Sequence, residues 1–173
     1  MSEEKNEVLK LKSNRKIWVA GVVGAMIGFL LCGIVVFTAM PSLMIVTREC
    51  KLGFDETVAA LEKRIPEHGL AISGDQPIDM NKSMAKHGVT FKPRVKLVKL
   101  CNAEYAKDVL ATDRHVSRMM PCTFSVWEGD GGKVYLSKMN MALMAKMFGG
   151  NVAKVMGKKV AHDEEEMLQG LLK

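Results

Sequence analysis

The stretch that decides the fold is CTFSVWEGDGGKVYLSKM, residues 122–139. Its two halves, Cys122–Glu128 and Lys133–Met139, are rich in β-branched and aromatic residues, which are typical of strands. The glycine-rich segment Gly129–Gly132 lies between them and is typical of a hairpin turn. A short hairpin of this kind favours a mixed α+β sheet over a parallel doubly wound one.

Further strands and helices are predicted on the N-terminal side of this hairpin. Arg94–Leu100 alternates charged and apolar residues, which predicts a half-buried strand with one wet face. Apolar residues at helical spacing predict a helix from Phe54 to about His68. The remaining predictions are strands at Leu43–Glu49 and Leu70–Ile72, a short helix at Asp79–His87, and a helix capped by Asn102 that ends near Thr112.

The chain beyond the hairpin is predicted to be helical. The segment NMALMAKMF stops at Gly149-Gly150, and Asp163 with Glu166 resembles a capping pair for a last helix. The expected fold class is α+β, with one N-terminal transmembrane helix and a small mixed sheet that has helices packed on one face. We divide the chain into a tail (1–16), a transmembrane helix (17–40), an α+β domain (43–157) and a C-terminal helical tail (158–173).

The predicted transmembrane helix is IWVAGVVGAMIGFLLCGIVVFTAM, residues 17–40, which contains no charged residue. At about 1.5 Å per residue it reaches roughly 36 Å, enough to cross a hydrocarbon core of about 30 Å. A cleaved signal peptide is the alternative, but its apolar core is shorter and it needs a small-residue cleavage site. Thr38-Ala39-Met40 fits such a site poorly, so we predict a retained single-pass anchor.

The charges on either side of this helix predict its orientation. Lys5, Lys10, Lys12, Arg15 and Lys16 precede it, whereas the next charge after it is Arg48. Because short cytoplasmic segments retain Lys and Arg, the N-terminus is expected in the cytoplasm. The expected location is the cell (inner) membrane, with the main domain periplasmic or otherwise extracytoplasmic.

The net charge of +6 falls to +4 once residues 1–16 are set aside. This mild surplus suits membrane lipid or an acidic partner protein better than nucleic acid. No aromatic-rich basic stripe is present, so nucleic acid is not an expected partner.

Several segments resemble the domain-of-unknown-function family 302. They are Gly53-Phe54-Asp55-Glu56-Thr57, LCNAEYAKDVL, the Met-Pro-Cys that opens a strand, VYLSKMN and LMAKMFGG. The resemblance covers roughly Val46 to Met156 and implies a small α+β domain that often forms homo-oligomers. Membrane-anchored members look like accessory components near respiratory, sulfur or metal metabolism, which is an association and not a mechanism. His115 and the extra Met residues before Pro121 depart from the family pattern.

Cys101 and Cys122 are the sharpest chemical feature of the domain. Each lies at a predicted strand boundary, so both are expected at the same end of the sheet. An outward compartment permits a disulfide between them, while buried unreactive thiols and a redox or metal role remain alternatives. The helix that begins at Asn102 would lower the pKa of a reduced Cys101. Three outward cysteines leave one without a partner, and we expect it to be Cys50.

The loop before Cys122 places His115, Met119 and Met120 close to that thiol in the sequence. Soft ligands of this kind suit copper, and His with Met also suits a non-covalent haem. A solvated loop histidine is the simpler interpretation. The sequence requires no cofactor, and copper or haem stays a hypothesis.

Gly24 and Gly28 form a G-x-x-x-G motif in the predicted span, which is typical of close helix packing. No phosphate-binding loop, HExxH or G-x-S-x-G motif is present, so the sequence favours a protein that is not an enzyme. The leading hypothesis is a membrane-anchored accessory or structural subunit of a respiratory or redox membrane complex, docking onto other subunits. Alternatives are an extracytoplasmic metal-, haem- or thiol-redox protein and, from Cys101 alone, an enzyme acting on small sulfur compounds.

Overall fold

The computed structural model describes the backbone of residues 2–173 and the side chains of residues 18, 19 and 21–173. The chain divides into two compact units, residues 1–41 and 42–173. The side chains of the predicted cytoplasmic tail, residues 1–16, lie outside the described residues, as does that of Ile17, where the predicted span begins. Each unit is considered by itself below.

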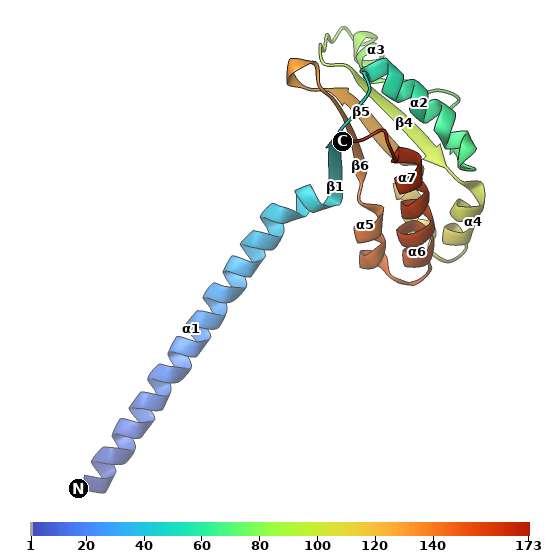
Figure 1. Cartoon of the computed structure of the whole chain (residues 1–173). Coiled ribbons are helices and arrows are strands. Elements are labelled where there is room, and N and C mark those ends of the chain that lie inside the picture. The colour runs from blue at the N-terminus through green and yellow to red at the C-terminus, as the bar shows by residue number, and fades with distance from the viewer. Residues whose placement is uncertain (1) are drawn as a thin grey trace. The chain divides into compact units, whose positions relative to one another are not determined.

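The first unit is formed by helix α1, which runs from Ser2 to Met44 and extends into the second unit (Figure 1). Within it, Gly21–Met44 has a mean hydropathy of 2.5 and is long and apolar enough to cross a membrane. The helix continues past Met40 through Pro41, so it ends four residues later than predicted. The predicted strand at Leu43–Glu49 is shortened accordingly and begins at Ile45.

The second unit is built on one antiparallel sheet. The strands are β1 (Ile45–Glu49), β2 (Ala71–Ile72), β3 (Ile78–Asp79), β4 (Val95–Cys101), β5 (Cys122–Glu128) and β6 (Val134–Met139). Their order is β1-β6-β5-β4-β2, and β3 also pairs with β4. Every one of these pairings is antiparallel. The α+β class predicted from the hairpin is therefore confirmed.

The predicted hairpin joins β5 to β6 with Glu128 opposite Val134. Its turn contains the short 3₁₀ segment η2 (Asp130–Gly132), and Gly131 and Gly132 both have positive φ. Glycine reaches this region without the steric penalty that a Cβ imposes, so the glycine run allows the tight reversal.

Six α-helices and two irregular helical segments complete the second unit. The first four elements are α2 (Phe54–Glu67), α3 (Met80–Ala85), α4 (Ala103–Thr112) and the 3₁₀ helix η1 (Arg114–Met119). After β6 come α5 (Met141–Phe148), α6 (Gly150–Lys154), the π-helical turn η3 (Val155–Val160) and α7 (Ala161–Leu168). Asn102 caps α4 as predicted, because its side chain accepts hydrogen bonds from the N–H groups of Glu104 and Tyr105.

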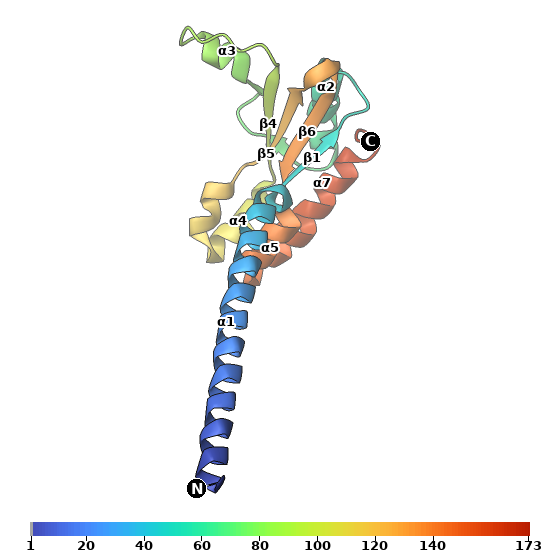
Figure 2. The same ribbon diagram turned by 90° about the vertical axis from the view of Figure 1, so that its left-hand side faces the viewer.

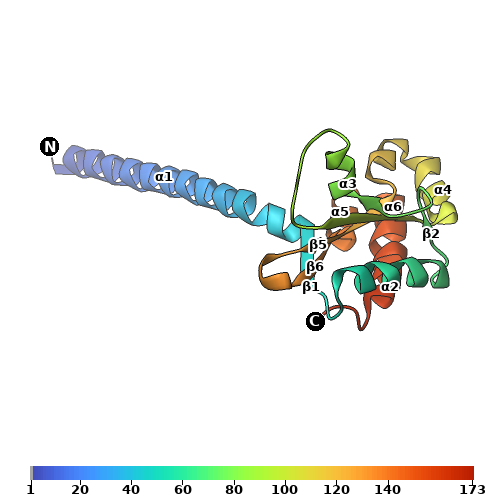
Figure 3. The same ribbon diagram turned by 90° about the horizontal axis from the view of Figure 1, so that it is seen from above.

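The main core lies between one face of the sheet and helices α2 and α7. Figures 1 and 3 show both helices on the same side of the sheet. Alternate strand residues point into this core, among them Val98, Leu100, Phe124 and Leu136, all at most 1% exposed. The prediction of helices on one face of the sheet is confirmed.

A second, smaller core joins the helical segments that follow β4 and β6. It contains Val109 of α4, Val116 of η1, Met141 and Ala145 of α5, and Val155 of η3. Gly157 allows the close approach of η3 to α5, because a Cβ added there would lie 2.8 Å from the Cβ of Ala145. These helices therefore form a compact group at one end of the sheet.

Two local predictions were wrong. The Asp163–Glu166 pair does not cap a helix, because the backbone is already helical from Val155 through Leu168, with no capping side chain before α7. The short strand β3 was missed because two residues carry no detectable period. Met167 and Leu168, in the predicted C-terminal tail, belong to the main core.

Candidate functional site

The face of the sheet opposite α2 and α7 is the best candidate for a functional surface. Strand alternation places on it residues that are half-buried or exposed, whereas their neighbours in the middle of β5 and β6 are buried in the core. We call "open face" the following eight residues of β1, β5 and β6: Ile45, Thr47, Thr123, Ser125, Trp127, Tyr135, Ser137 and Met139. None of them carries a charge. Figure 2 shows these three strands side by side.

An aromatic pair lies at one end of the open face. The rings of Trp127 and Tyr135 are stacked with centroids 4.6 Å apart and an interplanar angle of 24°. Tyr135 also lies against Gly129, where an added Cβ would come within 2.6 Å of the ring. The absence of a side chain at Gly129 therefore leaves room for the ring of Tyr135.

Hydroxyl groups connect the middle of the open face. The indole Nε1–H of Trp127 donates to Ser137 Oγ at 2.9 Å. Ser137 Oγ lies 2.7 Å from Thr47 Oγ1, so a chain of hydrogen bonds crosses three strands. This network satisfies the polar groups of Trp127, Ser137 and Thr47 without introducing a charge.

A cavity of about 380 Å³ lies at the end of the sheet where β1 begins and β6 ends, and residues of both the open face and the helix-covered side line it. Five open-face residues contribute to it: Ile45, Thr123, Ser125, Ser137 and Met139. The rest of its lining comprises Arg118, Met119, Pro121, Cys122, Lys138, Met141 and Glu164. The surface thus combines a flat aromatic part with a recess.

A buried ion pair lies at this recess. Lys138 Nζ of β6 is 2.7 Å from Glu164 Oε2 of α7, and their side chains are only 15% and 2% exposed. Burial raises the pKa of Glu164, while Lys138 opposes that rise. Because a buried pair of this kind contributes little net stability, its presence beside a cavity points to a role in the site.

Cys122 lies at the same recess as a free thiol. Burial, followed by the charge of Glu164, raises the pKa of Cys122 to about 12. A thiol with such a pKa remains protonated near neutral pH, when it is a weak nucleophile and a poor metal ligand. Cys122 therefore contributes packing and polarisable surface to the recess.

Cys101 ends the neighbouring strand and is likewise a free thiol. The β4–β5 register pairs Leu100 with Cys122, so alternation directs Cys101 and Cys122 to opposite faces of the sheet. The thiol of Cys101 lies 3.7 Å from the carbonyl oxygen of Asn102. Cys50 is buried in the main core and is also free. The predicted disulfide stays a prediction.

Three residues of the predicted metal or haem site, Met119, Met120 and Cys122, pack against the second core, whereas His115 is not part of it. Met119 lines the recess beside Cys122, and Met120 packs against the second core. His115 is exposed and its ring lies 6.2 Å from that of Phe148. Within the described part of the chain, no group of three or more His, Cys, Asp or Glu residues is placed to hold a metal ion.

Gly24 and Gly28, predicted to pack against another helix, lie in the first unit. No described atom comes within 4 Å of a Cβ added at either position. Their helix surface is therefore open within the described chain, and helix packing there stays a prediction.

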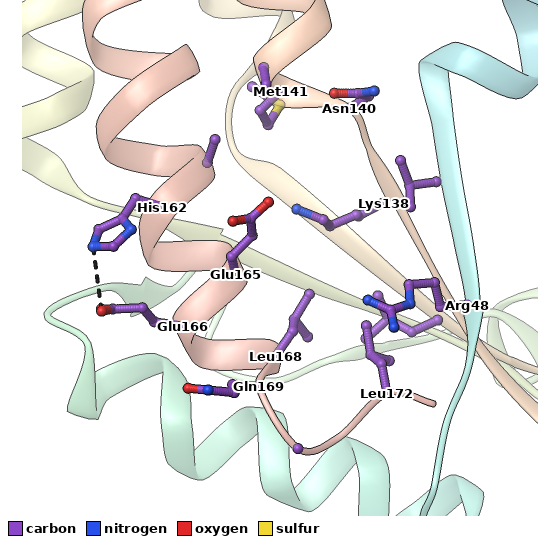
Figure 4. A pocket seen from close by; sticks show the side chains of 15 residues that line it. Arg48, Lys138, Asn140, Met141, His162, Glu165, Glu166, Leu168, Gln169 and Leu172 are labelled. Carbon is purple, nitrogen blue, oxygen red and sulfur yellow. Dashed lines mark ion pairs between the residues drawn. The ribbon is translucent and has the colours of Figure 1, made fainter.

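A larger cavity of about 690 Å³ lies on the helix-covered side, between α7 and the β1–β6 edge. Figure 4 shows Arg48 and Lys138 reaching into it from the strands and Glu165 reaching toward Lys138 from α7. His162 and Glu166 form an ion pair of 3.4 Å on the same helix. Charges of both signs line this cavity, which shares Lys138 and Met141 with the recess.

The sequence indicated some of this surface and missed the rest. The alternation of polar and apolar residues in the two hairpin strands can be seen in the sequence. It separates open-face residues from core residues. The pairing of Lys138 with Glu164 was not visible, because 26 residues and an unpredicted π-helical turn separate them. One signal could have revealed the pairing: Lys138 is a charged residue at a strand position whose neighbours in the alternation face the core.

Three of the eight open-face residues, Trp127, Tyr135 and Met139, are of types that are common in protein–protein interfaces. Tyr, Trp and Met are enriched at the centres of such interfaces, and charged residues are depleted there. A recess beside stacked aromatic rings is also a suitable receptor for an anchoring side chain of a partner. The arrangement is therefore suited to binding a neutral surface.

The comparisons with known proteins concern the second unit. The family model described as "Domain of unknown function DUF302" matches residues 46–173. The crystal structure of an uncharacterized conserved DUF302 protein from Bacillus stearothermophilus is similar, with a TM-score of 0.63 and 17% sequence identity. The likeness covers 73% of this chain and 97% of that one, so that chain consists almost entirely of this domain. No curated protein matches the chain.

Proposed function

Because the chain belongs to the DUF302 family, whose fold carries no assigned chemistry, we propose a function from the surface of this member. The protein is a membrane-anchored, non-enzymatic accessory subunit. Its domain binds another subunit in the same membrane through the open face. The observation that supports this most strongly is a neutral, aromatic sheet face on a protein in which 25% of residues are charged.

The partner suited to this face is a protein with a flat, uncharged and largely apolar surface. Two charged residues border the open face in the same alternation: Glu49, the cross-strand partner of Tyr135, and Lys99, the cross-strand partner of Thr123. An apolar side chain of the partner would enter the recess between Ile45, Met119 and Met139. Desolvation of Thr47, Ser137 and the indole of Trp127 costs little, since these three groups already bond to one another.

The proposed location follows from the flanks of the apolar helix. Basic residues before the span and a charge-free stretch after it favour an N-terminus in the cytoplasm and a domain outside the inner membrane. An anchor confines the domain and its partner to one surface, which raises their effective concentration and permits a modest interface to suffice. Gly24 and Gly28 offer a second contact, between spans.

The alternative of a metal, haem or thiol-redox protein draws no support from the site. The pKa of Cys122, raised to about 12, opposes both metal ligation and thiolate chemistry at neutral pH. His115 lies outside the recess. A respiratory or redox complex as the partner assembly stays a prediction.

Co-purification tests the proposed function. The full chain, tagged and gently solubilised from its native membrane, should elute with another membrane protein. Thr47→Arg places a charge on the open face and should reduce recovery of that protein at least about tenfold, because a charge would be buried without a partner. Thr90→Arg makes the same change at an exposed loop position and should leave recovery unchanged.

Two results would contradict the proposal. One is a tagged chain that elutes alone or only as a self-dimer. The other is an equal loss of the partner with Thr47→Arg and Thr90→Arg, which would show that the open face is not the contact.

A further inference from the structure

A second surface of the domain is basic and partly apolar. The segment Met141–Val160, here called the basic segment, comprises α5, α6 and η3. It contains Lys146, Lys154, Lys158 and Lys159 and no acidic residue. The segment therefore carries a net charge of +4.

The basic segment begins where the candidate span ends. Asn140 directly precedes it and donates from its backbone N–H to the carbonyl oxygen of Met44 at 2.8 Å. The side-chain amide of Asn140 donates to the carbonyl oxygen of Leu43 at 3.1 Å. Leu43 and Met44 are the final residues of the apolar stretch Gly21–Met44, so α5 starts beside the end of that stretch.

The exposed side of α5 carries large apolar side chains. Met147 is 58% exposed and Phe148 is 44% exposed, whereas Met144 and Ala145 of the same helix are buried in the domain. The ring of Phe148 contacts that of His115, which connects α5 to η1 and its exposed residues Arg114 and Arg118. The helix thus has one face in the second core and one apolar patch outside it.

Three of the lysines have no counter-charge within the domain. Among the described ion pairs, Lys159 alone of the four is engaged, with Asp108 at 3.6 Å. No described acidic group lies within ion-pair distance of Lys146, Lys154 or Lys158. Their charge is available to an external anion.

We propose that the basic segment docks onto the surface of a bilayer containing anionic lipids. Met147 and Phe148 enter the boundary between headgroups and acyl chains, while the lysines meet lipid phosphates. Apolar side chains beside unpaired basic residues are the pattern by which helices bind the membrane interface. Leu43 and Met44 are covalently continuous with the candidate span, so the span holds the basic segment near the membrane surface. Docking then does not require the domain to bind from solution.

Vesicle co-sedimentation tests this proposal independently of any partner protein. The domain 42–173 should bind phosphatidylcholine vesicles that contain phosphatidylglycerol, and the binding should weaken as salt is added. The double variant Met147→Ser/Phe148→Ser and the charge variant Lys154→Glu/Lys158→Glu should each weaken it on the order of tenfold. Circular dichroism should show unchanged folding, because all four side chains are exposed.

Matched control variants lie at the other end of the sheet, near α3. Phe91 is 45% exposed, so Phe91→Ser removes a comparable apolar group, and Lys86→Glu/Lys92→Glu makes the same charge change. Both should bind vesicles like the wild type. No binding by the wild-type domain, or equal losses in control and test variants, would overturn the proposal.

The full chain gives a second readout. In nanodiscs the span holds the protein in the bilayer whatever the lipid, so hydrogen exchange reports docking alone. Amides of α5 should exchange more slowly with phosphatidylglycerol than with phosphatidylcholine alone, and Lys154→Glu/Lys158→Glu should abolish the difference. Equal exchange in both lipids would refute docking in the anchored protein.

Discussion

At the scale of single residues, the recess contains ionisable side chains whose burial costs free energy. Lys138 and Glu164 pair across 2.7 Å with little access to water. Cys122 lies close enough to Glu164 for that charge to raise the pKa of its thiol further. These groups depend on one another, so a change in one is expected to alter the others.

Alkaline pH tests the burial of Cys122. A thiol that ionises near pH 9 when unfolded but near 12 when folded binds an extra proton in the folded state between these values. The free energy of unfolding should therefore fall as pH rises from 9 to 12, with a contribution of about 4 kcal/mol from this thiol. Urea unfolding of Cys122→Ala should show a shallower decline, and parallel curves for variant and wild type would exclude this cause.

The ion pair supports a double-mutant prediction. Lys138→Met should lower the free energy of unfolding by about 3 kcal/mol, because Glu164 would remain buried without its counter-charge. Lys138→Met/Glu164→Leu should recover most of that loss, since a buried apolar pair of similar volume costs no desolvation of charge. Additive effects of the two single substitutions in urea unfolding would argue against a coupled pair.

At the scale of helices and strands, most elements were predictable because their signals are local. The hairpin glycines, the Asn102 cap and the apolar period of α2 each specify one element without help from the rest of the chain. The π-helical turn η3 was not predictable, because it is fixed by packing against α5. This missed turn joins α6 to α7, and it also explains why Asp163 begins no helix.

Gly157 permits a direct test of that packing. Gly157→Ala should lower the free energy of unfolding by about 1–2 kcal/mol, because its Cβ would lie 2.8 Å from the Cβ of Ala145. Adding Ala145→Gly should remove the clash. The double variant should therefore lose less free energy of unfolding than the sum of the losses in the two single variants. Thermal unfolding of the four proteins measures this coupling, and strict additivity would show that the two residues do not touch.

At the scale of the whole molecule, an apolar helix and a small α+β domain together suggest a protein that works at a membrane surface. The sequence predicted the helix because about 24 apolar residues need no tertiary information to be recognised. It predicted less of the candidate site, since the open face exists only once β1 pairs with β6 across some 90 residues. The recess depends further on α7, which arrives last in the chain.

Anchoring gives the first whole-molecule prediction. The full chain should remain with membranes after an alkaline carbonate wash, because a helix that crosses the bilayer is not released by this treatment. The domain 42–173 should fold but be released by the same wash, since surface docking alone is electrostatic and reversible. Recovery of the full chain in the wash supernatant would mean that the helix does not span the membrane.

The central claim is that the open face binds another membrane protein, and site-specific photo-crosslinking tests it most directly. A benzophenone side chain at Ser125, on the open face, is compared with one at Glu62, on the exposed side of α2. In native membranes we predict an adduct with a second membrane protein from position 125 and none from position 62. The claim is contradicted if position 125 gives no adduct, gives only an adduct with a second copy of the chain, or gives the same adduct as position 62.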